Sequence, residues 1–286
     1  MFNFYNRLKT IYLYKVSLIG LFLCLSASCS GEKIDTGQVF RMPITNEPPT
    51  LDWSLATDSV SFDILSNIME GLTQYDSNMD PIPAIAKRWE ISKNKKIITY
   101  YLRDDVFWTD GKPVTAHDFE YSWKRLLNPA TAAQYAYFLF DVENAQEFNS
   151  GNISDSSLVG VSAKTNHILE VRLKKAVVYF PSITTFMVTF PQRKDIVEKF
   201  GDHWTDPENI VTNGPFKLIE WKHEYKLTLT SNENFYEGPP QIDKILAYVV
   251  REKTTALTLY ETGELDMVEL PPVAIPHFRN HDEYKN

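Results

Sequence analysis

Residues 102–119 constrain the fold of this chain more than any other stretch, because they follow a strand with a tight turn and a capped helix. The side chains of residues 97–102 have the alternating pattern of a half-buried strand. Asp110-Gly111 is a strong turn dipeptide. Thr115 with Asp118 three residues later is the pattern of a capping box at the start of a helix. The stretch is typical of fixed scaffold rather than of a catalytic loop.

Apolar periodicity and turn residues predict the remaining elements and the fold class. Strands are predicted at residues 38–45, 97–102, 167–173, 216–221, 225–230, 245–250 and 265–268, and helices at 59–72, 115–127, 141–150, 194–200 and 254–262. A short helix is predicted from residue 179, a polar helix from 273, and a turn at 81–83. Strands and helices follow no strict strand–helix–strand repeat, so the predicted class is α/β of the mixed α+β kind, with mixed sheets.

The first 28 residues predict a lipoprotein signal peptide. They carry Arg7, Lys9 and Lys15 and no acid, and then an apolar run over residues 16–25. A run of about ten residues suits a signal core and is shorter than the ~20 needed to span a bilayer. Small residues precede Cys29, which is the expected site of lipid attachment and the new amino terminus. Cys24 would be removed with the signal, so no disulfide framework is available.

Composition argues for a folded, acidic domain. The formal net charge is −8, and the signal contributes three positive charges, which leaves −11 for the remaining residues. Such a chain is a poor partner for nucleic acid or for an anionic lipid surface. Hydrophobic residues at 43% and aromatic residues at 13% are ample for a packed core.

The sequence offers no pattern for catalysis, a cofactor or a metal. The six histidines are scattered, and the one pair at i, i+4, His277 and His281, lies in a polar stretch that a surface helix explains better. No serine sits in Gly-x-Ser-x-Gly, and no glycine-rich phosphate loop is present. We therefore expect a protein that is not an enzyme and binds no cofactor.

Several short motifs share their order and spacing with one family. These are Leu51-Asp52, Glu70-Gly71-Leu72, Tyr121-Ser122-Trp123, Asn128-Pro129-Ala130-Thr131-Ala132, Asn209-Ile210-Val211-Thr212-Asn213-Gly214-Pro215-Phe216 and Gly263-Glu264-Leu265-Asp266. Together with residues 102–119 they resemble extracytoplasmic solute-binding protein family 5, whose members deliver peptides to ABC importers. The match is better to the oligopeptide-binding branch than to the dipeptide or nickel branches.

The resemblance implies a periplasmic binding protein fold of type II, built of lobes. A first, discontinuous lobe would comprise residues 29–69 and 194–286, and a second lobe, residues 70–193, would be inserted into it. Members of the family continue into a further lobe that closes over the peptide. This chain is expected to be the amino-terminal half, with the third lobe absent from it.

The resemblance also implies the ligand-binding residues. In the oligopeptide binders an extended peptide lies between the lobes, bonded through its main chain as an added strand. The implied contacts are Thr57, Asp58, Ser59, Tyr135, Phe186, Glu269 and Leu270. Two alternatives stand beside this assignment: residues 57–59 fit a plain helix cap, and Phe186 fits core packing.

The expected function is extracytoplasmic binding of oligopeptides and their delivery to the permease subunits of an ABC importer, by cleft closure and without chemistry on the ligand. The protein would be held at the membrane by lipid on Cys29 and would be a monomer once completed by the missing lobe. One alternative is a different solute in the same fold: a nickel chelate, a sugar or a signalling peptide. Another is a truncated or split-gene remnant, or an interaction module, without transport activity.

Overall fold

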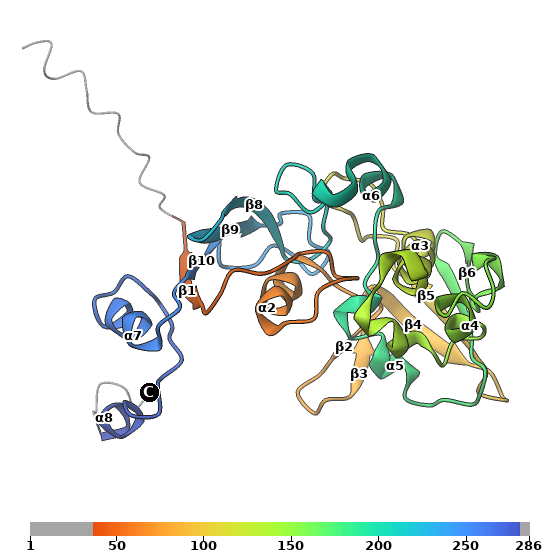
Figure 1. The fold of residues 1–286 in the computed structure, drawn as a ribbon, viewed down its shortest axis with the longest axis horizontal. Coiled ribbons are helices and arrows are strands. Elements are labelled where there is room, and N and C mark those ends of the chain that lie inside the picture. Colours follow the sequence, from red (N-terminus) through yellow and green to blue (C-terminus); the bar gives the residue numbers. More distant parts are fainter. Residues whose placement is uncertain (1–36, 281–286) are drawn as a thin grey trace, which may run out of the picture. The chain divides into compact units, whose positions relative to one another are not determined.

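The computed structural model describes residues 37–280 (Figure 1). Cys29 and His281 lie outside the described residues. The fold class is the mixed α/β arrangement that the sequence predicts, with several sheets and helices. The described strands form two four-stranded sheets and one two-stranded sheet.

The first sheet gathers strands from both ends of the described chain. It contains β1 (Val39–Ile44), β8 (Phe216–Lys222), β9 (Lys226–Ser231) and β10 (Lys244–Val249), in the order β1-β10-β9-β8. Strand β1 pairs parallel to β10, whereas the other neighbours are antiparallel. Helix α2 (Ser59–Ile68) contacts β8 and buries Ile64, Leu65 and Ile68. This sheet therefore supports α2 through β8.

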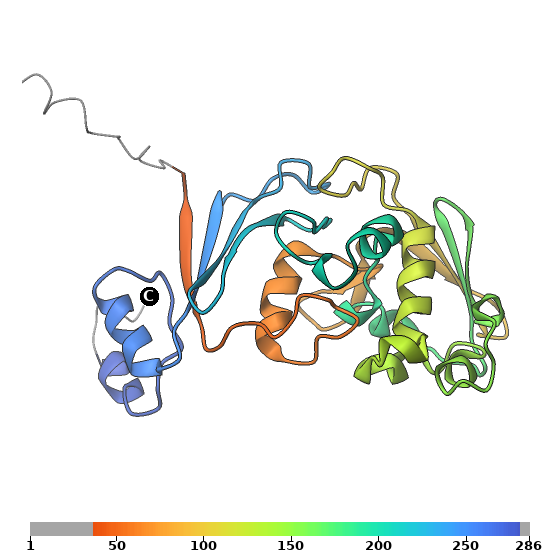
Figure 2. The ribbon, with the colours of Figure 1, turned by 45° about the horizontal axis from the view of Figure 1, so that its top comes forward.

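The second sheet is antiparallel and is covered by helix α3 (Ala116–Leu127). Its strands are β4 (Ala86–Ile91), β5 (Ile97–Leu102), β6 (Val161–Thr165) and β7 (Ile168–Arg172), in the order β4-β5-β7-β6. Helix α3 packs against β6 and β7 with Phe119, Trp123 and Leu126 buried (Figure 2). The predicted alternation of β5 is confirmed, because every second residue from Ile98 to Leu102 is buried.

Short elements complete the fold. The hairpin β2 (Thr73–Tyr75) and β3 (Pro81–Pro83) forms the two-stranded sheet. The remaining helices are η1 (Pro129–Thr131), η2 (Gln134–Leu139), α4 (Ala145–Asn149), η3 (Ser156–Leu158), α5 (Phe180–Ile183), η4 (Met187–Thr189), α6 (Lys194–Phe200), η5 (Gly201–His203), α7 (Lys253–Glu261) and α8 (Ile275–Asn280).

Several sequence predictions need correction. Residues 81–83, predicted as a turn, form β3, and strands β2, β4 and β6 were not predicted. The strand predicted at 265–268 is wrong. The Asp266 N–H donates to the Arg41 carbonyl of β1, and the Asp266 carboxylate accepts from the Arg41 N–H, but residues 265–268 form no regular strand. The helix predicted to reach residue 72 ends at Ile68.

The early end of α2 has a tertiary cause. The Gly214 N–H donates to the Ile68 carbonyl at 2.9 Å, and Asn213 Oδ1 accepts from the Glu70 N–H at 3.0 Å. A Cβ on Gly214 would lie 2.5 Å from the Ile68 carbonyl carbon, so only glycine permits this approach. The Asn213-Gly214 motif therefore ends a helix that lies about 145 residues earlier in the chain.

The strand–turn–helix stretch is the scaffold that its sequence predicts. Gly111 adopts φ +85° in the turn, and the Asp118 carboxylate accepts from both the N–H and the hydroxyl of Thr115, at 2.8 and 3.0 Å. The Thr109 N–H donates to the Thr212 carbonyl at 2.8 Å. The loop before α3 is thus fixed against the segment that ends α2.

A buried polar network joins residues 51–54 to α3 and to residues 190–204. Both carboxylate oxygens of Asp52 accept from the Arg125 guanidinium, at 2.9 and 2.6 Å, and one also accepts from Trp204 Nε1 at 3.2 Å. Trp53, fully buried, donates from its indole to the Phe190 carbonyl at 3.3 Å. We call Asp52, Arg125 and Trp204 the Asp52 network. It fixes the chain immediately before α2.

Candidate functional site

The start of helix α2 holds three of the predicted contact residues. Asp58 is the N-cap: its carboxylate accepts from the Ser61 N–H at 2.9 Å and from the Ser61 hydroxyl at 2.7 Å. The capping role that the sequence left open is therefore present for Asp58. Ser59 is exposed, and Thr57 is half-buried.

The main chain beside this cap carries donors that the fold does not use. Within residues 37–280, the N–H groups of Thr57 and Asp58 donate no hydrogen bond. The Thr57 carbonyl accepts from the Tyr135 hydroxyl at 3.3 Å, and the Asp58 carbonyl accepts from the Phe62 N–H at 3.2 Å. Unpaired backbone donors need a partner when a ligand excludes water from them. The stretch can therefore bond to the main chain of an added strand.

Five aromatic rings gather next to this stretch. Tyr135 lies 6.3 Å from Phe62, 5.6 Å from Phe138 and 5.7 Å from Phe186, measured between ring centroids. Tyr137 lies 5.9 Å from Tyr135 and 4.7 Å from Phe138. We call these five residues the aromatic cluster. The structure thus brings together Thr57, Tyr135 and Phe186, three residues that the resemblance implied.

The other members of the aromatic cluster were missed by sequence reasoning. Tyr137 and Phe138 share the 3₁₀ helix η2 with Tyr135, and the sequence Tyr-Ala-Tyr-Phe was a local signal for them. Phe62 comes from α2 and Phe186 from the residue before η4. No local pattern pairs Phe62 with Tyr135, because their contact depends on how α2 and η2 pack.

Glu269 and Leu270 lie in a different part of the structure. Glu269 is exposed and forms an ion pair with Lys253 of α7, with Nζ and Oε1 2.7 Å apart. Leu270 is half-buried. Among the described residues, no hydrogen bond, ion pair or ring contact joins either residue to the aromatic cluster. The structure does not bring them to Thr57.

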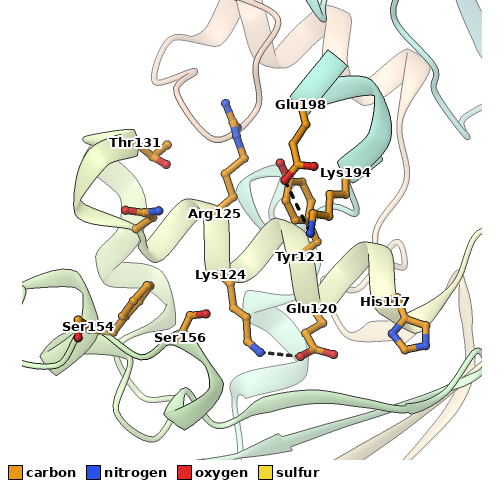
Figure 3. A pocket seen from close by; sticks show the side chains of 12 residues that line it. His117, Glu120, Tyr121, Lys124, Arg125, Thr131, Ser154, Ser156, Lys194 and Glu198 are labelled. Carbon is orange, nitrogen blue, oxygen red and sulfur yellow. Dashed lines mark hydrogen bonds and ion pairs between the residues drawn. The ribbon is translucent and has the colours of Figure 1, made fainter. Parts of the chain in front are cut away.

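A polar pocket of about 750 Å³ lies on the outer side of α3, between α6 and residues 154–156 (Figure 3). Its charges are largely paired with one another: Lys124 Nζ is 2.5 Å from Glu120 Oε1, and Lys194 Nζ is 3.7 Å from Glu198 Oε1. Arg125, which also lines it, is engaged by Asp52. The paired charges leave little for a ligand to recognise.

One buried acid stands out near the end of α2. Glu70 Oε2 and the Tyr236 hydroxyl oxygen are both buried without a hydrogen-bond partner in the described part of the chain. Burial raises the pKa of the Glu70 carboxyl to about 7. The Tyr236 hydroxyl and the positive charge of Arg103 oppose this rise, and the negative charge of Glu237 adds to it. The Glu70 carboxyl therefore keeps its proton to a higher pH than an exposed glutamate does.

Substitution of Glu70→Gln should flatten the dependence of stability on pH. Because the folded-state pKa is raised from 4.5 to about 7, the stability that this carboxyl contributes is complete below the unfolded value and is lost as pH rises through the folded value. In urea titrations between about pH 4.5 and pH 8, the unfolding free energy of the wild type should fall by about 1–3 kcal/mol more than that of the variant.

The exposed Glu233 provides the matched control for this substitution. Glu233→Gln should follow the wild type within about 0.5 kcal/mol at each pH. Parallel curves for the wild type and Glu70→Gln would contradict the raised pKa.

The range 37–280 contains no group of three or more His, Cys, Asp or Glu side chains placed to hold a metal ion. None of its helices combines the length and apolar character needed to cross a membrane.

The sequence matches one protein family and several of its members. The family model described as bacterial extracellular solute-binding proteins, family 5 Middle, matches residues 80–286. The dipeptide-binding protein DppE of Bacillus subtilis (strain 168) is 36% identical over 247 residues, which are 86% of this chain and 44% of that protein.

Solved structures agree. The substrate-binding domain of an oligopeptide ABC transporter from Bacillus anthracis (strain Ames) matches with a TM-score of 0.82 and 37% identity, covering 87% of this chain and 48% of that one. Listeria monocytogenes OppA, solved bound to peptide, matches with a TM-score of 0.81 and 30% identity, covering 86% of this chain and 49% of its own. The chain therefore spans about half the length of the relatives it matches.

Proposed function

The chain belongs to family 5 of the bacterial extracellular solute-binding proteins, and from this premise we propose that it binds oligopeptides outside the cytoplasm for delivery to an ABC importer. The ligand would be held and released without chemical change. The relatives favour this reading, since they are named as dipeptide- and oligopeptide-binding proteins and as part of an ABC transporter.

One observation carries the proposal: the N–H donors of Thr57 and Asp58 are unused within the described residues, and the Thr57 carbonyl between them is bonded to the Tyr135 hydroxyl. Successive N–H groups of an extended stretch face opposite sides. An extended peptide would therefore offer a carbonyl acceptor to the donor on its own side and would add to the stretch as a strand does. Main-chain bonds are common to all peptides, so they supply affinity that is independent of side-chain identity.

We propose that residues 29–69 and 194–286 form one lobe and residues 70–193 another. The Asp52 network crosses this boundary, as does the Tyr135 bond to Thr57. Buried, bidentate contacts of this kind resist separation, so the two lobes would move as one body. The opposing wall of the peptide site would come from the part of the family fold that the relatives have beyond the matched half.

Anchoring by lipid on Cys29 is part of the proposal and rests on the signal-like residues 1–28. Substituting Cys29→Ala should move the protein from the membrane fraction to the soluble fraction, or leave it unprocessed. The measurement is fractionation of cells followed by mass spectrometry of the amino terminus. A mature wild-type amino terminus without an acyl chain, or membrane attachment of Cys29→Ala in a processed form, would contradict a lipid anchor.

Tyr135 provides the test of peptide binding itself. The purified chain, titrated calorimetrically with mixed tripeptides to pentapeptides, should show saturable binding that is far weaker than that of a relative carrying the opposing wall. Tyr135→Ala should weaken that binding by about 1–3 kcal/mol, because it removes both a ring and a hydroxyl from the site. Tyr135→Phe keeps the ring and should lose at most about 1 kcal/mol.

A matched control for Tyr135 is Tyr101, which is also half-buried and lies on β5. Tyr101→Ala should leave peptide affinity within the error of the titration. Two results would contradict the proposal: the absence of binding to any peptide, or equal losses from Tyr135→Ala and Tyr101→Ala.

A further inference from the structure

We propose that the aromatic cluster makes this protein selective for peptides that carry a bulky apolar side chain, aromatic ones above all, at the residue lying against Thr57 and Asp58. The inference rests on the proposed function and adds to it a class of substrate. Main-chain bonding alone would accept any peptide. The aromatic cluster would distinguish one peptide from another.

The rings are arranged as a supported surface with an accessible side. Tyr137 is 53% exposed, while Phe62, Tyr135, Phe138 and Phe186 are partly buried and pack against the hydrophobic core. Phe186 contacts Phe62 edge to face at 5.5 Å and Phe138 at 4.8 Å. Rings held by a core keep their positions when a ligand arrives, so little ordering cost falls on binding. An incoming ring would find edges and faces at the spacing that aromatic pairs prefer.

The neighbouring main chain identifies the occupant. The Tyr135 hydroxyl donates to the Thr57 carbonyl, which places the aromatic cluster against the short main-chain stretch that carries the unused N–H groups of Thr57 and Asp58. A ligand that satisfies both features must bring hydrogen-bond acceptors together with an apolar group a few ångströms away. An extended peptide with an aromatic or large aliphatic side chain has this combination.

The acidic residues near the aromatic cluster would attract a cationic side chain less strongly than the aromatic cluster would attract an apolar one. Both carboxylate oxygens of Asp58 already accept hydrogen bonds from Ser61. Asp63 is exposed, and an exposed charge attracts a cation weakly because solvent and salt screen it. The aromatic cluster itself contains no charged residue. Apolar contact is therefore the stronger source of selectivity here.

The test is a panel of tripeptides Ala-X-Ala with X as Phe, Trp, Leu, Ala, Lys or Glu, titrated into the purified chain. Peptides with Phe or Trp should bind about tenfold more tightly than those with Ala, Lys or Glu, and Leu should lie between. Tyr137→Ala should reduce the ratio of Phe to Ala affinity to about threefold or less, whereas Tyr137→Phe should keep it. Thermal unfolding of each variant shows whether it is folded.

Tyr225 is the matched control, because its ring is 54% exposed, close to the value for Tyr137, and packs against Tyr248 outside the aromatic cluster. Tyr225→Ala should leave the Phe to Ala ratio unchanged. Three results would overturn this inference and leave peptide binding standing. They are binding with no preference among the peptides, a preference for Lys, and equal changes of the Phe to Ala ratio in Tyr137→Ala and Tyr225→Ala. If no peptide binds at all, the proposed function fails, and the inference with it.

Discussion

The buried carboxylate of Asp52 is the interaction on which the site depends. It is 5% exposed and accepts from Arg125 of α3 and from Trp204, so three segments far apart in the sequence meet at one group. Removal of one partner from a buried ion pair typically costs about 3–5 kcal/mol, because the other charge is left without compensation. The pair therefore resists any arrangement of these segments other than the one observed.

This constraint leads directly to the geometry of the candidate site. Asp52 lies six residues before the Asp58 cap, so fixing Asp52 fixes where α2 begins. Helix α3 carries Arg125, and the chain that leaves α3 passes through η1 into η2, where Tyr135 reaches back to Thr57. The aromatic cluster and the unused main-chain donors thus share one anchor. Their proximity follows from packing and needs no ligand.

Local signals predicted a large share of the fold, and contacts between distant residues account for the rest. The stretch from β5 to α3 was predictable almost residue by residue, because its strand period, turn and capping box are encoded within a few residues of one another. The end of α2 depends on Asn213 and Gly214, which no pattern within α2 reveals. At the site, Thr57 and Tyr135 came from resemblance to a family. The packing of Phe62 against Tyr135 could not be found from spacing alone.

The central claim is that the main chain at Thr57 and Asp58 bonds to the peptide. The most direct measurement is amide hydrogen exchange, resolved by residue with NMR, in the free protein and with saturating Ala-Phe-Ala. Exchange at the one of these two amides that faces the peptide should slow by about tenfold or more on binding. The amide of Glu233, which likewise donates no hydrogen bond within the described residues, should not change. Peptide binding seen by titration without slower exchange at either Thr57 or Asp58 would contradict the account.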